Sequence, residues 1–131
     1  MRKFLYFLPA AVYYALIFYL SQRSYDFEVS VPHFDKGAHF LEYALLAILL
    51  FFGYFKSFET DMKMKAFLAF ITATLLAIGD EIHQYFIPGR ESDILDVIAD
   101  AGGIIFGLFL FWYFFRRIKL KITSNKSRRE T

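Results

Sequence analysis

The chain has 131 residues, a formal net charge of +2 and no cysteine, and 57% of its residues are hydrophobic, including 18 Phe and 9 Tyr. A soluble domain of this length has too little interior to bury so many rings, which argues against an ordinary soluble protein. The lack of cysteine excludes disulfides, thiolate metal sites and a cysteine nucleophile. The length predicts a single domain over residues 1–131.

Four apolar segments predict an all-α integral membrane protein, a four-helix bundle. A helix needs about 20 residues to cross the hydrocarbon, within a range of about 17–25, and each segment reaches that length once its polar end is placed at the interface. Buried helices of a soluble protein are the alternative, but they would leave almost no sequence for an amphipathic outer surface. The predicted spans, in chain order, are 4–20, 38–55, 66–87 and 94–115.

The basic residues orient these spans. Most of the 15 Lys and Arg residues lie before the first span, between the second and third, or after the fourth. The positive-inside rule therefore predicts a multi-pass protein with both termini in the cytoplasm. Segments 21–37 and 84–93 then face outward, and the exceptional cations on that side are Arg23, Lys36 and Arg90.

The C-terminal segment 116–131 is strongly basic and is predicted to lie on the cytoplasmic side. A basic segment beside a span is typical of an anchor against anionic lipid. Binding of nucleic acid is the alternative for such a run, but it is the weaker interpretation, and we predict no nucleic-acid partner.

Ionisable residues gather at three span ends. Because consecutive spans alternate in direction, the start of the second, the end of the third and the start of the fourth meet on the outward side. A charged group at mid-bilayer costs about 2.5–3.5 kcal/mol or more, so these residues must face the bundle interior and find partners. The predicted binding residues are Arg23, Asp35, Lys36, His39, Tyr43, Asp80, Glu81, Gln84, Arg90, Asp93, Asp96 and Asp100.

Some of these positions also have a purely structural interpretation. Asp35 and Asp93 fit the N-caps of the second and fourth helices, and Tyr43 fits an interfacial aromatic belt. Gly103 and Gly107 have the spacing of small residues that let helices approach closely. That approach would occur within one chain, or between two copies in an oligomer.

Four short motifs in this order carry a resemblance to a known family. The motifs are Ser21-Gln22-Arg23-Ser24; Asp35-Lys36-Gly37-Ala38-His39-Phe40 with Tyr43; Asp80-Glu81-Ile82-His83-Gln84-Tyr85-Phe86 with Pro88-Gly89-Arg90; and Asp93-Ile94-Leu95-Asp96-Val97-Ile98-Ala99-Asp100 with Gly103 and Gly107. Together they resemble the VanZ-like family of bacterial membrane proteins. The resemblance implies a four-helix domain in the bacterial cytoplasmic membrane and an association with low-level resistance to the glycopeptide teicoplanin. Asp100 departs from the family, which usually has Asn there.

The leading functional hypothesis is a site for a cell-envelope lipid, its anionic head group or a lipid-linked cell-wall precursor. Arg23, Lys36, His39 and Arg90 lie near two helix N-termini on the outward side. Cations and helix N-termini both favour anions, and arginine suits bidentate contact with phosphate.

Two alternatives remain open beside lipid binding. The first is an enzyme acting on a phosphate-containing lipid, with His39 or His83 as base or nucleophile and Glu81 or Asp96 as acid–base group. The second is a structural ion-pair network in which Arg90 pairs with Glu81 or Asp96.

A metal held by His39, Glu81, His83 and Asp96 is disfavoured at this stage because the chain contains no compact ligand motif such as H-E-x-x-H. We therefore predict no metal and no cofactor. An ion path is also disfavoured, since the fourth span has no ionisable residue between Asp100 and Arg116.

Overall fold

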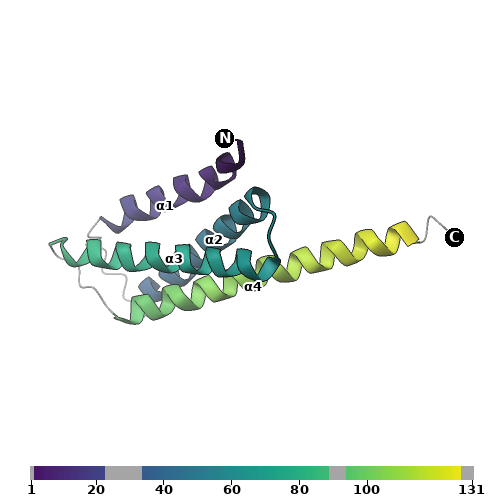
Figure 1. Cartoon of the computed structure of the whole chain (residues 1–131). Coiled ribbons are helices and arrows are strands. Elements are labelled where there is room, and N and C mark those ends of the chain that lie inside the picture. Colours follow the sequence, from purple (N-terminus) through teal and green to yellow (C-terminus); the bar gives the residue numbers. More distant parts are fainter. Residues whose placement is uncertain (1, 23–33, 89–93, 128–131) are drawn as a thin grey trace.

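The protein is an all-α bundle, as predicted, in a computed structural model that describes residues 2–22, 34–88 and 94–127. The side chains of 34, 35 and 124–127 are not described. Figure 1 shows the helices, with the start of α1 and the end of α4 away from the end of the bundle where α2 and α4 begin. The elements are a 3-10 helix η1 at Arg2–Phe7, then α1 at Leu8–Ser21, α2 at Phe34–Ser57, α3 at Met62–Tyr85 and α4 at Ile94–Ser127.

Four helical segments are long and apolar enough to cross a membrane, which confirms the predicted number of spans. The third helix ends at Tyr85, two residues before the expected end at 87. The fourth continues far beyond the expected end at 115, so the basic segment begins as helix. The spanning segments are Arg2–Ser21, Lys36–Ser57, Met62–Tyr85 and Ile94–Thr123.

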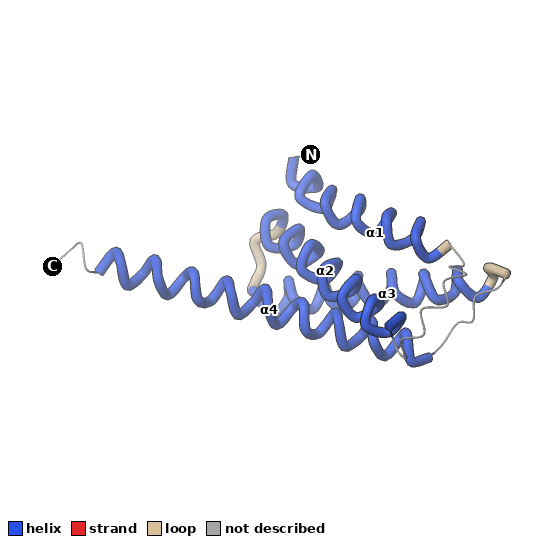
Figure 2. The backbone as a smooth tube through the Cα atoms, turned by 180° about the vertical axis from the view of Figure 1, so that it is seen from behind, coloured by secondary structure: helices blue, strands red, loops and turns tan. Residues whose placement is uncertain are grey.

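Helix α4 is too long to lie wholly within a bilayer. Its 34 residues correspond to about 51 Å at about 1.5 Å per residue, against about 30 Å of hydrocarbon. Figures 1 and 2 show its C-terminal part extending beyond the other helices. That part carries the basic residues Arg116, Arg117, Lys119 and Lys121, which are exposed.

Aromatic and basic side chains meet at this end of the bundle. The Arg116 guanidinium lies 5.3 Å from the centre of the Trp112 ring, and that of Arg117 lies 5.2 Å from Tyr113. Arg117 Nε also donates to the Tyr113 hydroxyl at 3.1 Å. Such pairs are typical of a membrane–water interface, where amphipathic rings and cations settle at the head-group level.

Local sequence explains how the short connection between α2 and α3 is built. Asp61 precedes α3 in extended conformation, and its side chain accepts a hydrogen bond from the Met64 backbone N–H at 2.7 Å. This N-cap satisfies one of the unpaired donors that every helix start leaves. The cap begins α3 only a few residues after α2 ends at Ser57, so these two helices must run antiparallel.

Helices α2 and α4 make the most extensive contact in the bundle. A Cβ on Gly103 would overlap the backbone carbonyl of Phe40, and one on Gly107 would overlap that of Ala44. The two glycines therefore let the helix backbones touch, as small residues do in membrane bundles. Both are buried against α2 of the same chain. An oligomer through Gly103 and Gly107 stays an untested prediction, and it would need a surface that α2 already covers.

The apolar core lies between α2, α3 and α4. Helix α3 contributes only alanines to it, spaced one turn apart, so the larger side chains of α2 pack directly against its backbone. Where the apolar core ends, toward the start of α2 and α4, the buried residues become polar. Helix α1 adds two residues to the core, and the fully or nearly buried core residues are Ala10, Ile17, Tyr43, Leu46, Ala47, Leu50, Phe51, Ala69, Ala73, Ala77 and Ile104.

Candidate functional site

One end of the bundle holds a layer of polar side chains. The end of α1, the start of α2, the end of α3 and the start of α4 meet there, opposite the chain termini (Figures 1 and 2). We call it the polar layer. Its members are Ser21, Lys36, His39, Asp80, Glu81, Gln84, Asp96 and Asp100.

The structure brings together in the polar layer all the predicted binding residues whose side chains it describes, except Tyr43, which belongs to the apolar core. Carboxylates from α3 and α4 are as buried as the apolar core, with Asp80 and Asp100 each only 1% exposed. Ionisable groups this deep inside a membrane bundle are costly unless they are paired, so the partners of each decide what the layer can do.

The deepest contact joins His39 to Asp100. His39 Nδ1 lies 3.0 Å from Asp100 Oδ1, linking α2 to α4. With Asp100 ionised, its oxygen can only accept, so Nδ1 carries the proton, and in neutral His39 Nε2 is then the acceptor for another partner. The second carboxylate oxygen, Asp100 Oδ2, makes no hydrogen bond within the described part of the chain.

A second contact between the same helices lies one turn nearer the end of the bundle. Lys36 Nζ donates to Asp96 Oδ1 at 3.1 Å, and the two side chains are 20% and 9% exposed. The four-residue spacing from Asp96 to Asp100 sets them on one face of α4. The three-residue spacing from Lys36 to His39 does the same on α2. The two pairs therefore stack along the contact between the two helices.

A third set of contacts joins α1 to α3. Ser21 Oγ donates to Asp80 Oδ1 at 2.8 Å and also lies 2.9 Å from the carbonyl oxygen of Phe18. Gln84 Nε2 donates to the other oxygen, Asp80 Oδ2, at 2.9 Å. Sequence reasoning did not place Ser21 in the site. The sequence did hold one indication. Ser21 lies at the very end of a span, where its hydroxyl can donate a hydrogen bond to an aspartate buried in a neighbouring helix.

Three side chains from three helices converge at the centre of the polar layer. One ligand-type atom each from His39, Glu81 and Asp96 lies within 4.8 Å of the other two. His83, which the sequence had placed with them, is not in this group among the described residues. Its ring packs on Phe18 of α1, with ring centres 4.2 Å apart.

Tyr43 belongs to the core rather than to the lipid boundary. It is fully buried one turn after His39, so the interfacial-belt interpretation of this residue is wrong. Its hydroxyl makes no hydrogen bond with any described residue. The position of Tyr43 near the end of a span fits a belt residue or an inward-facing one, and only the tertiary packing decides between them.

Four predicted site positions lie outside what the structure describes. They are Arg23, Arg90 and Asp93, together with the side chain of Asp35. The N-cap roles of the two aspartates and the pairing of Arg90 with Glu81 or Asp96 therefore stay predictions.

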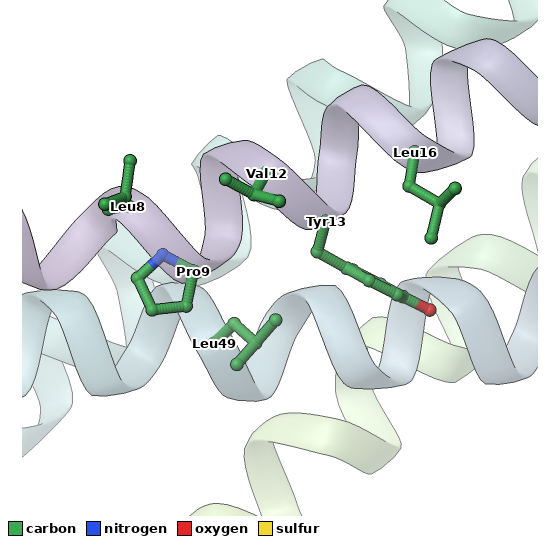
Figure 3. A pocket seen from close by; sticks show the side chains of 6 residues that line it. All are labelled: Leu8, Pro9, Val12, Tyr13, Leu16 and Leu49. Atoms are coloured by element: carbon green, nitrogen blue, oxygen red, sulfur yellow. The ribbon is translucent and has the colours of Figure 1, made fainter.

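An apolar groove of about 610 Å³ lies elsewhere, between α1 and α2. Figure 3 shows its lining, with five side chains on α1 and Leu49 on α2. In a bilayer such a surface is in contact with hydrocarbon, and it offers almost no polar group to select a ligand. The groove therefore offers none of the ionisable side chains that gather in the polar layer.

A sequence model of the VanZ/LLP1 family matches residues 2–116. The chain belongs to the VanZ/LLP1 family. This confirms the resemblance drawn from the motifs, and the matched range covers the polar layer completely. No curated protein and no solved structure matches the chain.

The polar layer of this VanZ-family protein can perform two kinds of chemistry. The Lys36 ammonium offers a cation for an anionic group. The His39 ring, held through Nδ1 by Asp100, presents Nε2 as a base or as a metal ligand.

Proposed function

We propose that this VanZ-family protein lies in the bacterial cytoplasmic membrane with both termini in the cytoplasm. Its polar layer faces outward and binds the phosphate-containing head group of a cell-envelope lipid. One observation carries the proposal: His39, Glu81 and Asp96 converge from three helices although each is less than 9% exposed. Such buried ionisable groups inside a membrane bundle are functional candidates by default.

Lipid, rather than a soluble metabolite, is favoured by what surrounds the polar layer. The outward-facing neighbours on the same helix segments are large apolar side chains that contact hydrocarbon. A lipid can place its head group in the layer while its tails stay in the membrane. These neighbours are Leu41, Ile82, Ile94, Leu95 and Ile98, which are 65%, 56%, 76%, 48% and 61% exposed.

Phosphate is favoured by the electrostatics of the same end. Helices α2 and α4 both begin there, and a helix N-terminus stabilises negative charge. Lys36 adds a full positive charge at the entrance of the layer, where its side chain is still 20% exposed. Arg23 and Arg90 supply two further cations on this side in the predicted topology.

Replacing Lys36 by methionine should weaken binding of anionic lipid at least tenfold. The reason is that a hydrogen bond to a charged group contributes about 1.5–3 kcal/mol, and about 1.4 kcal/mol is tenfold in affinity. The measurement is native mass spectrometry of purified protein with phosphatidylglycerol and with a polyprenyl phosphate. Arg90→Ala should have a similar effect.

The matched control is Lys63→Met, because Lys63 is an exposed lysine at the start of α3, at the opposite end of the bundle. It should bind both lipids as the unchanged protein does. Equal lipid affinity of Lys36→Met, Arg90→Ala and the unchanged protein, with all three folded, would show that the layer is not a phosphate site.

A second candidate function is catalysis on such a lipid, and the 3.0 Å contact between His39 and Asp100 favours it. A histidine held at Nδ1 by a carboxylate has Nε2 oriented to take a proton from a nucleophile. The same lipid mixtures, incubated and then analysed for products, test this. Turnover that His39→Ala abolishes while lipid binding persists supports an enzyme, and intact lipid after prolonged incubation supports binding alone.

Membership of the VanZ/LLP1 family extends the proposal to the phenotype associated with the VanZ-like family, low-level teicoplanin resistance. Binding of an envelope lipid or a lipid-linked cell-wall precursor would change the supply of material on which glycopeptides act. We therefore expect expression in a teicoplanin-sensitive bacterium to lower teicoplanin susceptibility, measured as the growth-inhibiting concentration. Lys36→Met should remove that effect.

A further inference from the structure

We infer that His39, Glu81 and Asp96 form a binding site for one divalent transition-metal ion, Zn²⁺ or Mn²⁺. The inference adds a cofactor to the proposed site and does not depend on the lipid. The sequence alone disfavoured a metal because it contains no compact ligand motif. The ligands come instead from α2, α3 and α4, so no short motif could contain them.

The spacing of the three donor atoms suits a single ion. They lie within 4.8 Å of one another. Donors that share an ion at about 2.0–2.2 Å can be separated by at most about 4.4 Å. Small side-chain rotations are therefore enough to bring all three into contact with one ion, without moving the helices.

The donor types narrow the choice of metal. One imidazole nitrogen and two carboxylate oxygens form a mixed set that suits transition ions, whereas Mg²⁺ and Ca²⁺ prefer oxygen donors alone. Three protein ligands also leave coordination positions open, as in catalytic zinc sites. An open position is what a phosphate oxygen would occupy if the proposed function holds.

A second contact of His39, with Asp100, supports the site in the arrangement where Nε2 is the metal ligand. Metal-bound histidines almost always donate their other nitrogen to a carboxylate or carbonyl group, which fixes the ring and its tautomer. Asp100 does this for His39, with Nδ1 and Oδ1 3.0 Å apart. Asp100 is 1% exposed, and its Oδ2 makes no hydrogen bond with any described residue. A role in positioning the metal ligand His39 explains why a carboxylate is buried at Asp100.

The closeness of two buried carboxylates, Glu81 and Asp96, indicates that a cation lies near them. Glu81 and Asp96 are 5% and 7% exposed, and like charges brought together in such a place repel strongly unless a cation lies near them. Lys36 Nζ lies 3.1 Å from Asp96 Oδ1. A carboxylate can bind an ammonium through one oxygen and a metal through the other, so this ion pair and the metal site are compatible.

The test uses full-length protein in detergent, stripped with a chelator and titrated with Zn²⁺ or Mn²⁺ alone, without added lipid. We expect about one ion per chain, measured by elemental analysis after desalting and by calorimetry. Glu81→Gln and Asp96→Asn should lower affinity at least tenfold. Bound Mn²⁺ should show coupling to a histidine nitrogen in pulsed electron paramagnetic resonance, and His39→Ala should abolish that coupling.

Glu59→Gln is the control, because Glu59 is an exposed carboxylate in the connection between α2 and α3, at the opposite end of the bundle from the polar layer. It should bind metal as the unchanged protein does. Asp100→Ala should weaken affinity by about 10–100-fold, and Asp100→Asn should recover most of that loss, because its amide oxygen can still accept from His39 Nδ1.

Two results would overturn the inference. One is folded, unchanged protein that retains well below one ion per chain. The other is equal metal uptake by Glu81→Gln and the unchanged protein, which would assign Glu81 to an ion-pair network instead. Since no lipid is present, failure of this test leaves lipid binding standing, and failure of lipid binding leaves the metal site standing.

Discussion

Gly103→Ala and Gly107→Ala should each destabilise the bundle severely, by about 3 kcal/mol or more. The added methyl group would overlap the backbone carbonyl of Phe40 or of Ala44 on α2. Overpacking a core costs about 1–3 kcal/mol when side chains can adjust. A helix backbone cannot rotate aside, so α2 and α4 would have to separate along their most extensive contact. Unfolding in mixed micelles, followed by circular dichroism, measures the loss.

The chain offers two graded glycine controls for this experiment. A Cβ on the adjacent Gly102 would meet only the Phe40 ring, at 3.5 Å, which is ordinary contact. Nothing lies within 4 Å of one on Gly37, so Gly37→Ala should stabilise α2 by about 0.5–1 kcal/mol through lost backbone entropy. Equal stability of the Gly102→Ala and Gly103→Ala proteins would contradict the packing of α4 against α2.

Asp80→Ala should loosen α1 from the bundle and lower stability by about 3 kcal/mol. Its two oxygens accept from Ser21 on α1 and Gln84 on α3, and a hydrogen bond to a charged group is worth about 1.5–3 kcal/mol. Helix α1 is the least buried of the four spans, with 17% of its most apolar window buried, and a further hydrogen bond to α3 runs from the Tyr14 hydroxyl to the Leu76 carbonyl oxygen at 3.2 Å. The loss of stability should therefore appear mainly as separation of α1 from the other helices.

The absence of cysteine from the chain allows that loss to be located. A single cysteine in place of Ile17, which is 3% exposed on α1, should react slowly with a maleimide in the otherwise unchanged protein and at least tenfold faster beside Asp80→Ala. The control is Asp80→Asn, whose amide oxygen can still accept from Ser21. Slow labelling in the Asp80→Ala background would show that the remaining contacts of α1, including the hydrogen bond from the Tyr14 hydroxyl to the Leu76 carbonyl oxygen, are enough to hold it.

Both stability predictions depend on residues whose importance the sequence indicated only in part. The glycine spacing predicted a close approach of helices, but it was equally consistent with contact inside one chain or between two copies. Asp80 was predicted as a site residue from its depth in a span, whereas in the structure one of its oxygens links α3 to Ser21 of α1 and the other accepts from Gln84 within α3. Spacing identifies the face of a helix; it does not identify what packs on that face.

The sequence by itself determined the four spans and the gathering of polar residues at one end. Hydropathy and length decide which segments cross a membrane, and alternating directions decide which ends share a side. It could not determine the partners, because the polar layer joins positions about 60 residues apart, such as His39 with Asp100 and Ser21 with Asp80. Only the tertiary structure decided that His39, Glu81 and Asp96 meet while His83 packs on Phe18. The rotation of each helix about its own axis selects among its polar residues, and that rotation is set by glycine and alanine packing between helices.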